Sequence, residues 1–269
     1  MERTEKRSAS ADVCVRLLMN IFDFDNEQNI LNYLLRYTEQ VLLSNGNSFE
    51  KKILRYIKDI DSFTSNNGHG DLPPDYYSDR YSVMFDVLRI NDTEVNKKYN
   101  PIKIEERKMR KQVLKSGMLD TPNIITVFAS DDVNEHSFDK YIKQAKRTIK
   151  NHIDKIPLWI KEHPAIKNKG LLVFDETEFC FEGFVKYVGN GEFAYCYKSP
   201  LVIHEAWNDK MFVQPIYESN LDFVIWFCPY KPYGNIPMKH NIKFPSIVIA
   251  DTRFQRTNYK EYDYNSLVM

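Results

Sequence analysis

Carboxylates stand at the ends of three apolar, strand-like runs of this sequence. The runs and the acids that follow them are 171–174 with Asp175 and Glu176, 247–250 with Asp251, and 124–128 with Asp131 and Asp132. When strands alternate with helices, the carboxyl ends of the strands meet at one edge of the sheet, where ligands bind. Carboxylates gathered there repel one another and favour a hard cation such as Mg²⁺. The pattern hints at metal-assisted chemistry on phosphates, although no short motif names a reaction by itself.

The tripeptide Asp251-Thr252-Arg253 directly follows one of these runs. On an extended chain, two residues separated by a single position project from the same face. Asp251 could therefore hold a divalent ion while Arg253 stabilises charge on a phosphate. The alternative is structural: Asp251 caps the next turn and pairs with Arg253.

Asp175 ends a continuous apolar strand and is the best candidate for a metal ligand within Asp175-Glu176-Thr177-Glu178. Mg²⁺ is held by one or two carboxylates and retains several waters. The alternative is that Asp175 caps a turn and Glu178 is solvated.

Asp86 interrupts the apolar strand expected at 81–90. Alternation places it on the face of Met84 and Leu88, with Arg89 on the opposite face. A strand this apolar has both faces covered, and a buried acid costs free energy unless it is paired, hydrogen-bonded or metal-bound. Asp86 is therefore either paired with an arginine or lysine from a neighbouring element or a third metal ligand.

A long helix expected at 138–163 carries seven Lys or Arg against three acids. Four of them, at i, i+3, i+7 and i+10, form one stripe: Lys140, Lys143, Arg147 and Lys150. A basic stripe on a helix can follow a phosphate backbone. The same pattern is also typical of a solvated surface helix. Pro157 is expected to kink this helix or to start a second one.

Composition narrows the class of protein. With 43% hydrophobic and 28% charged residues, the chain is typical of a soluble globular protein, and no apolar run reaches the ~20 residues of a membrane span. The four cysteines lack C-x-x-C spacing and no secretory signal is evident, so we expect a cytoplasmic protein with reduced thiols. The net charge of zero excludes a general polycation. Phosphate-loop, dinucleotide and nucleophile-elbow motifs are absent, which argues against ATPases, dinucleotide enzymes and serine hydrolases.

Periodicity predicts an α/β fold: a mixed or mostly parallel sheet flanked by helices, with a helical N-terminal layer. Helices are expected at 11–22, 25–42, 48–60, 101–116, 138–163 and 206–218. Strands are expected at 81–90, 123–129, 170–174, 179–188, 221–227 and 244–250. The Asn-, Gly- and Ser-rich stretch 62–74, closed by two prolines, is the expected boundary between the N-terminal layer, 1–66, and the α/β domain, 70–269.

Four runs, 72–79, 86–92, 172–176 and 223–230, resemble a set of uncharacterised bacterial proteins with no assigned activity. This resemblance spans about residues 70–255 and groups Asp75, Asp86, Arg89, Asp175 and Asp251, without implying a reaction.

The spacing of the acids also resembles that of PD-(D/E)xK nucleases, with Arg253 in place of the usual lysine. Arginine does not readily deprotonate, so Arg253 is not expected to act as the base that the lysine provides in that family. The expected strand order also departs from that fold, because a helix separates strands 81–90 and 123–129.

Two functions follow as expectations. The first is a metal-dependent nuclease or phosphodiesterase, in phage defence or a mobile element. In it Asp86, Asp175 and Asp251 hold Mg²⁺, Arg253 stabilises the phosphate, and the stripe from Lys140 to Lys150 guides nucleic acid. The second is a non-catalytic binding or regulatory protein whose basic helix contacts a protein or nucleic-acid partner. Geometry discriminates between them, because carboxylates that share one Mg²⁺ lie roughly 2.0–2.1 Å from it. The oligomeric state is not predicted.

Overall fold

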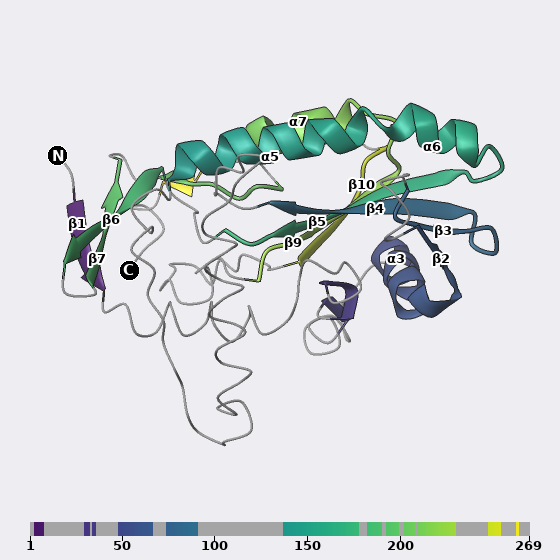
Figure 1. Cartoon of the computed structure of the whole chain (residues 1–269), viewed down its shortest axis with the longest axis horizontal. Helices are drawn as coiled ribbons and strands as arrows, with labels where there is room; N and C mark the ends of the chain where they lie inside the picture. Colours follow the sequence, from purple (N-terminus) through teal and green to yellow (C-terminus); the bar gives the residue numbers. More distant parts are fainter. Residues whose placement is uncertain are drawn as a thin grey trace, which may run out of the picture.

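The structure is a computed structural model that describes residues 3–7, 30–32, 34–35, 48–66, 74–90, 137–177, 182–189, 192–198, 202–207, 209–229, 247–253 and 262–263. Figure 1 shows the arrangement of its elements. The helices are α3 (Ser48–Lys58), the 3-10 turn η1 (Ile60–Ser62), α5 (Phe138–Ile153), α6 (Ile156–Glu162) and α7 (Lys210–Tyr217). The strands are β1 (Arg3–Arg7), β2 (Thr64–Ser65), β3 (Tyr76–Ser78), β4 (Val83–Ile90), β5 (Asn168–Asp175), β6 (Gly183–Gly189), β7 (Glu192–Tyr197), β8 (Val202–Ile203), β9 (Phe223–Phe227), β10 (Ile247–Asp251) and β11 (Tyr262–Asp263).

A mixed six-stranded sheet with the order β10-β9-β5-β4-β3-β2 forms the centre of the molecule. Strands β4, β5 and β9 are parallel, and the remaining neighbours pair antiparallel. The parallel strands are apolar on both faces, which is typical of strands covered on both sides. The expected α/β fold with a mixed sheet is confirmed.

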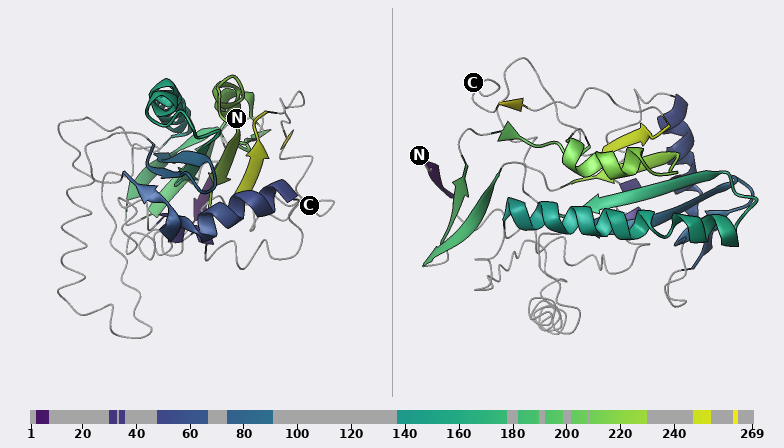
Figure 2. Two further views of the ribbon diagram at one scale, coloured as in Figure 1. Left: turned by 90° about the vertical axis from the view of Figure 1, so that its right-hand side faces the viewer. Right: turned by 90° about the horizontal axis from the view of Figure 1, so that it is seen from above.

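Helices cover both faces of this sheet. The connections from β4 to β5 and from β5 to β9 run in the same direction across the sheet, so helices α5 and α7 lie on the same face. Figure 2 shows α5 and α7 side by side on that face and α3 on the other. We call these the α5 face and the α3 face. Each has its own buried apolar cluster, one around Trp159 and Trp226 and the other around Ile57 and Phe85.

Local sequence signals set the limits of α5 and α6. The Ser137 side chain accepts a hydrogen bond from the Lys140 N–H and caps the start of α5. The helix ends at Ile153, and Pro157 lies in the first turn of α6, where its missing N–H costs nothing. The expectation that Pro157 starts a second helix is confirmed, so the run 138–163 forms two helices.

The strand expected at 179–188 does not pair with the strand that precedes it in the sequence, β5. Strand β6 forms a hairpin with β7, and β7 also pairs with β1, giving a separate three-stranded sheet. That sheet lies beyond the N-terminal end of α5, where Ser137 forms a bridge with Phe184.

The N-terminal half of the chain is described only in part. Residues 30–32 and 34–35 are helical, and α3 begins at Ser48 as expected. The expected helices at 11–22 and 101–116, the strand at 123–129, and Asp131 and Asp132 lie outside the described residues. The domain division at 66–70 stays a prediction. None of the helices described here is both long and apolar enough to cross a membrane.

Candidate functional site

Asp86 is buried on the α5 face, in contact with a second carboxylate residue and a histidine. Its Oδ1 accepts the backbone N–H of Asp75 at 2.9 Å, and its Oδ2 lies 2.7 Å from Nδ1 of His152. Oδ2 of Asp75 accepts the backbone N–H of Val87 at 2.7 Å. Burial, and then the charge of Asp86, raise the pKa of Asp75 to about 6, against the opposing effects of the Val87 N–H, His152 and Lys155. Asp75, Asp86 and His152 thus form one cluster, with Asp86 hydrogen-bonded to both of the others.

The partner of Asp86 differs in type from the arginine or lysine expected from the sequence. His152 comes from the last turn of α5, on the side that packs against the sheet. The buried residues Tyr141, Ala145 and Ile149 are spaced by four, and His152 follows three residues later, on the same face. A histidine in phase with an apolar helix face is the signal that could have identified this partner.

Asp175 is fully buried at the carboxyl end of β5 and accepts hydrogen bonds from Tyr141, Trp226 and Thr177. Oδ2 receives the Tyr141 hydroxyl at 2.6 Å and Nε1 of Trp226 at 3.4 Å. Oδ1 receives the backbone N–H and the hydroxyl of Thr177, at 3.1 and 2.8 Å. The contacts with Thr177 are those of the turn cap proposed as the structural alternative, and the contact with Tyr141 joins the cap to α5.

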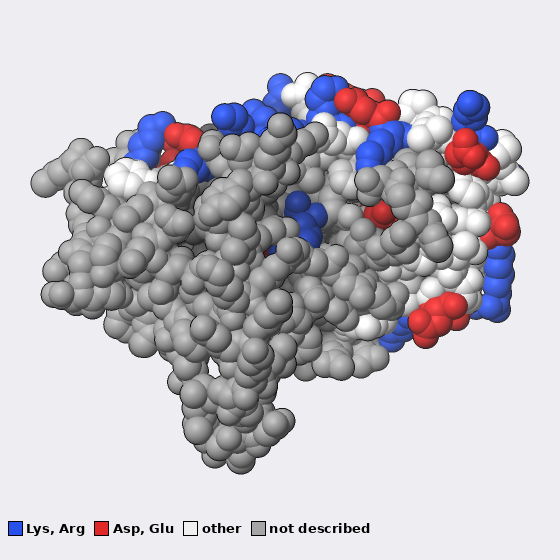
Figure 3. All heavy atoms as spheres, viewed as in Figure 1, with Lys and Arg blue, Asp and Glu red and all other residues white. Residues whose placement is uncertain are grey.

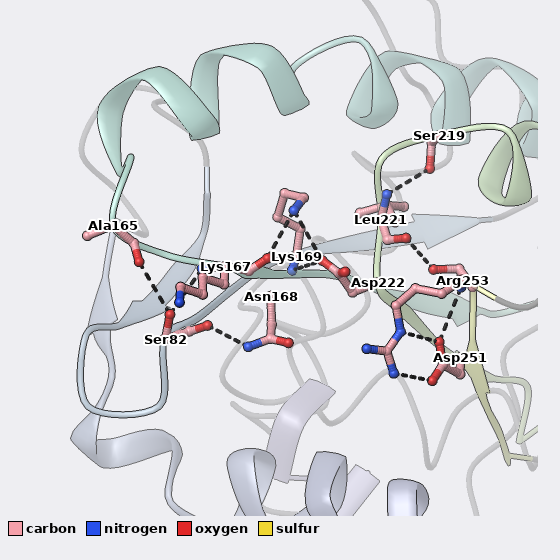
Figure 4. Close-up of polar contacts among 11 residues, drawn as sticks. Ser82, Ala165, Lys167, Asn168, Lys169, Ser219, Leu221, Asp222, Asp251 and Arg253 are labelled. Carbon is pink, nitrogen blue, oxygen red and sulfur yellow. Dashed lines mark hydrogen bonds and ion pairs between the residues drawn. The ribbon is translucent and has the colours of Figure 1, made fainter.

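Asp251 and Arg253 form an ion pair at the opposite end of the sheet (Figure 4). Nε of Arg253 donates to Oδ1 of Asp251 at 2.8 Å, and Nη2 of Arg253 donates to Oδ2. Arg253 in this way holds the pKa of Asp251 below its ordinary value. A second pair, Lys169 with Asp222, lies nearby where β5 and β9 begin. These contacts match the structural alternative for Asp251.

Arg89 lies on the α3 face, opposite to Asp86, as alternation predicts. Its guanidinium contacts Glu176 at 2.6 Å across the carboxyl ends of β4 and β5. This ion pair joins the ends of two parallel strands.

The three candidate metal ligands do not share one site. Asp86 pairs in register with Leu171, four residues before Asp175, which is roughly 13 Å along the strand. Asp251 is level with Phe223 and hence with Gly170, and it projects with Ile247 and Ile249 from the α3 face. The expectation that Asp86, Asp175 and Asp251 bind a single Mg²⁺ is not met, because the antiparallel direction of β10 carries Asp251 to the other end of the sheet. Nowhere in the described part of the chain are three or more His, Cys, Asp or Glu placed to hold a metal ion.

The basic stripe lies on the side of α5 that faces away from the sheet. Six residues of α5 are exposed, and four of them are basic: Lys143, Lys146, Arg147 and Lys150. Lys140 is half-buried. Nζ of Lys150 lies 2.9 Å from Asp154, and Arg147 donates to Gln144 at 2.7 Å. In Figure 3, Lys and Arg side chains follow the upper edge of the molecule, where Figure 1 places α5.

Another histidine–carboxylate pair lies beyond the N-terminal end of α5. Nδ1 of His204 lies 2.6 Å from Asp209, whose other oxygen caps α7 by accepting the Met211 N–H. The His204 ring packs against Phe138 with centroids 4.6 Å apart. These contacts connect the start of α7 with the start of α5.

We compared the chain with protein-family models, curated protein sequences and solved structures, and none of the three comparisons gave a match.

Proposed function

We propose that this protein binds the phosphate backbone of double-stranded nucleic acid through the outward face of α5, without cleaving it. The observation that carries the proposal is the composition of that face. Four of its six exposed residues are Lys or Arg, although the whole chain has no net charge. A local excess of cations on a helix of 16 residues, about 24 Å long, suits a linear array of phosphates.

The remaining residues of the face favour a duplex over a single strand. Proteins that bind single strands stack bases on aromatic side chains. The other exposed residues of α5 are Asp139 and Asn151, and its aromatic residues, Phe138 and Tyr141, are buried against the sheet. Contacts would therefore go to phosphates, and binding would be largely independent of sequence.

Salt dependence provides the first test. Each phosphate that is neutralised contributes about −0.9 to the slope of log K against log [salt]. Lys150 is engaged by Asp154, so about three contacts are expected, and affinity should fall roughly 40-fold between 50 and 200 mM salt. The measurement is fluorescence anisotropy with a labelled duplex of random sequence.

A matched pair of variants separates α5 from general charge effects. The triple change Lys143→Gln, Lys146→Gln and Arg147→Gln removes the three exposed cations of α5 that are not engaged by Asp154, and it should abolish most of the affinity and the salt slope. The control changes Lys51, Lys52 and Lys58 to Gln on α3, across the sheet, where all three side chains are exposed. Equal weakening by both variants, or no binding of the wild type at 50 mM salt, would refute the proposal.

A single substitution is expected to increase the affinity for the duplex. Asp154→Asn removes the acid that holds Lys150 at 2.9 Å, so it should strengthen duplex binding by a few fold at low salt. Binding that weakens in this variant would place the duplex away from the C-terminal half of α5.

A separate experiment tests the alternative expected from the sequence, a metal-dependent nuclease. The labelled duplex is incubated with the protein in Mg²⁺ or Mn²⁺ and then separated on a gel. Binding without cleavage supports the proposal made here. Cleavage that is lost in Asp175→Asn or Asp86→Asn would instead support the nuclease.

A further inference from the structure

Two carboxylates from adjacent strands lie against each other below the end of α5. Asp75 precedes β3, which pairs antiparallel with β4, and the register of the pair continues to place Asp75 directly opposite Asp86 on the α5 face. The N–H of Asp75 donates to Asp86, and Asp75 in turn accepts the N–H of Val87. The contacts hold both acids in place and bring two potential negative charges together in a partly buried site.

His152 connects this pair of acids to the helix. When Nδ1 carries a proton, it donates to Oδ2 of Asp86 at 2.7 Å, and this contact fastens the last turn of α5 to β4. The Asp86 side chain is 1% exposed and that of His152 is 20% exposed, so the carboxylate depends on this donor while protons can still reach the ring.

The other charged and titratable groups around Asp75 come from the same elements. Lys155, in the turn between α5 and α6, lowers the pKa of Asp75 together with His152. Asp154 in that turn pairs with Lys150 instead. From α6, the His163 ring packs on Tyr77 of β3 with centroids 4.1 Å apart.

We propose that Asp75, Asp86 and His152 form a proton-operated latch that fastens the C-terminal end of α5 to strands β3 and β4. With a proton on Asp75, Asp86 holds His152 without a second negative charge beside it. When Asp75 loses that proton, two adjacent carboxylates repel each other and the latched arrangement is weakened. The latch is a property of the fold and does not depend on what α5 binds.

The size of the effect follows from the two protonation equilibria of Asp75. Its pKa is about 6 in the latched state and has the ordinary value of 3.8 when the group is exposed. A raised pKa means that the proton stabilises the latched state below pH 4, and that this stabilisation is lost as the pH rises through 6. For these two values, the equilibrium for opening increases about tenfold between pH 5 and pH 8.

Hydrogen exchange, corrected for the intrinsic effect of pH, measures this opening. In the wild type, amides in 149–158 should open about tenfold more at pH 8 than at pH 5, while amides in α3 show no such change. Asp75→Asn keeps an acceptor for the Val87 N–H but cannot ionise, so its exchange at 149–158 should not depend on pH. The matched control is Asp154→Asn, an exposed acid in the same turn, which should keep the tenfold dependence.

Several results would overturn the latch. They are a wild type without the pH dependence, an Asp75→Asn variant that retains it, and an Asp154→Asn variant that loses it. If Asp75→Asn does not fold, the carboxyl ¹³C resonance of Asp75 in the wild type decides instead. A midpoint near pH 6 supports the latch, and one below about 4.5 contradicts it.

Discussion

The buried contact between Tyr141 and Asp175 is the best place to measure how α5 is attached to the sheet. Tyr141 is 1% exposed, Asp175 is fully buried, and the hydroxyl oxygen lies 2.6 Å from Oδ2. Tyr141→Phe removes this donor and leaves the apolar ring in place. Oδ2 keeps the hydrogen bond from Nε1 of Trp226 at 3.4 Å, which is longer and weaker than the one that is removed.

The expected cost is larger than that of a solvent-exposed turn cap. A hydrogen bond to a charged group contributes about 1.5–3 kcal/mol, and the loss of a short one at a buried carboxylate is expected to lie in the upper part of that range. We therefore expect Tyr141→Phe to lower the free energy of unfolding by about 2–3 kcal/mol. In the background of Asp175→Asn the acceptor is neutral, so the same change should cost only about 1 kcal/mol.

Urea denaturation of the wild type, both single variants and the double variant closes a double-mutant cycle. A coupling energy of about 1–2 kcal/mol between Tyr141 and Asp175 is expected. Thermal shifts of the wild type and of Asp175→Asn, with and without Mn²⁺, complete the assay. A coupling energy near zero would refute the structural role. A shift with Mn²⁺ that occurs in the wild type and is lost in Asp175→Asn would assign a metal to this carboxylate.

Two further predictions concern the end of the sheet where β5 and β9 begin. A Cβ at Gly170 would lie 2.0 Å from Cζ of Phe223, so Gly170→Ala should destabilise the protein by about 3 kcal/mol in urea denaturation, partly restored by Phe223→Leu. A cost below 1 kcal/mol would contradict this packing. Arg253→Ala breaks an exposed pair and should cost no more than about 1 kcal/mol at pH 7. Because Arg253 lowers the pKa of Asp251, that difference should vanish as acid protonates Asp251, and a constant cost across pH would exclude the ion pair as its cause.

The helices and strands were predicted well wherever the apolar residues follow a single period, either that of a helix or that of a strand. The apolar run at 221–227 and the capped helix from Ser48 both form close to the expected limits. Strand β3 was missed because Tyr76–Ser78 has only three residues, too few for alternation to be recognised. The fold class followed because helices that alternate with strands predict an α/β sheet whatever the exact pairing.

The candidate site was predicted less well, because strand direction is not visible in the sequence. A run that ends in an acid has the same appearance whether the strand is parallel or antiparallel. Asp175 lies at the carboxyl end of a parallel strand, as expected. Strand β10, however, runs antiparallel to β9 and places Asp251 at the other end of the sheet. The partner of Asp86 was missed because helix pairing across 66 residues is decided by tertiary packing.

The two proposals concern opposite sides of helix α5: the exposed cations lie on one side and His152 on the other. At 100° per residue, His152 lies about 140° around the helix from Arg147 and about 160° from Lys150. The cations therefore face away from the sheet while the histidine faces Asp86, as their exposure also indicates. Release of the latch would loosen the last turn of α5, which carries Lys150, and leave the first two turns held by Tyr141 and the Ser137 cap. In the proposed complex, contacts of Lys143 and Arg147 with a duplex would thus depend on the packing at Asp175, whereas the position of Lys150 would depend on the protonation of Asp75.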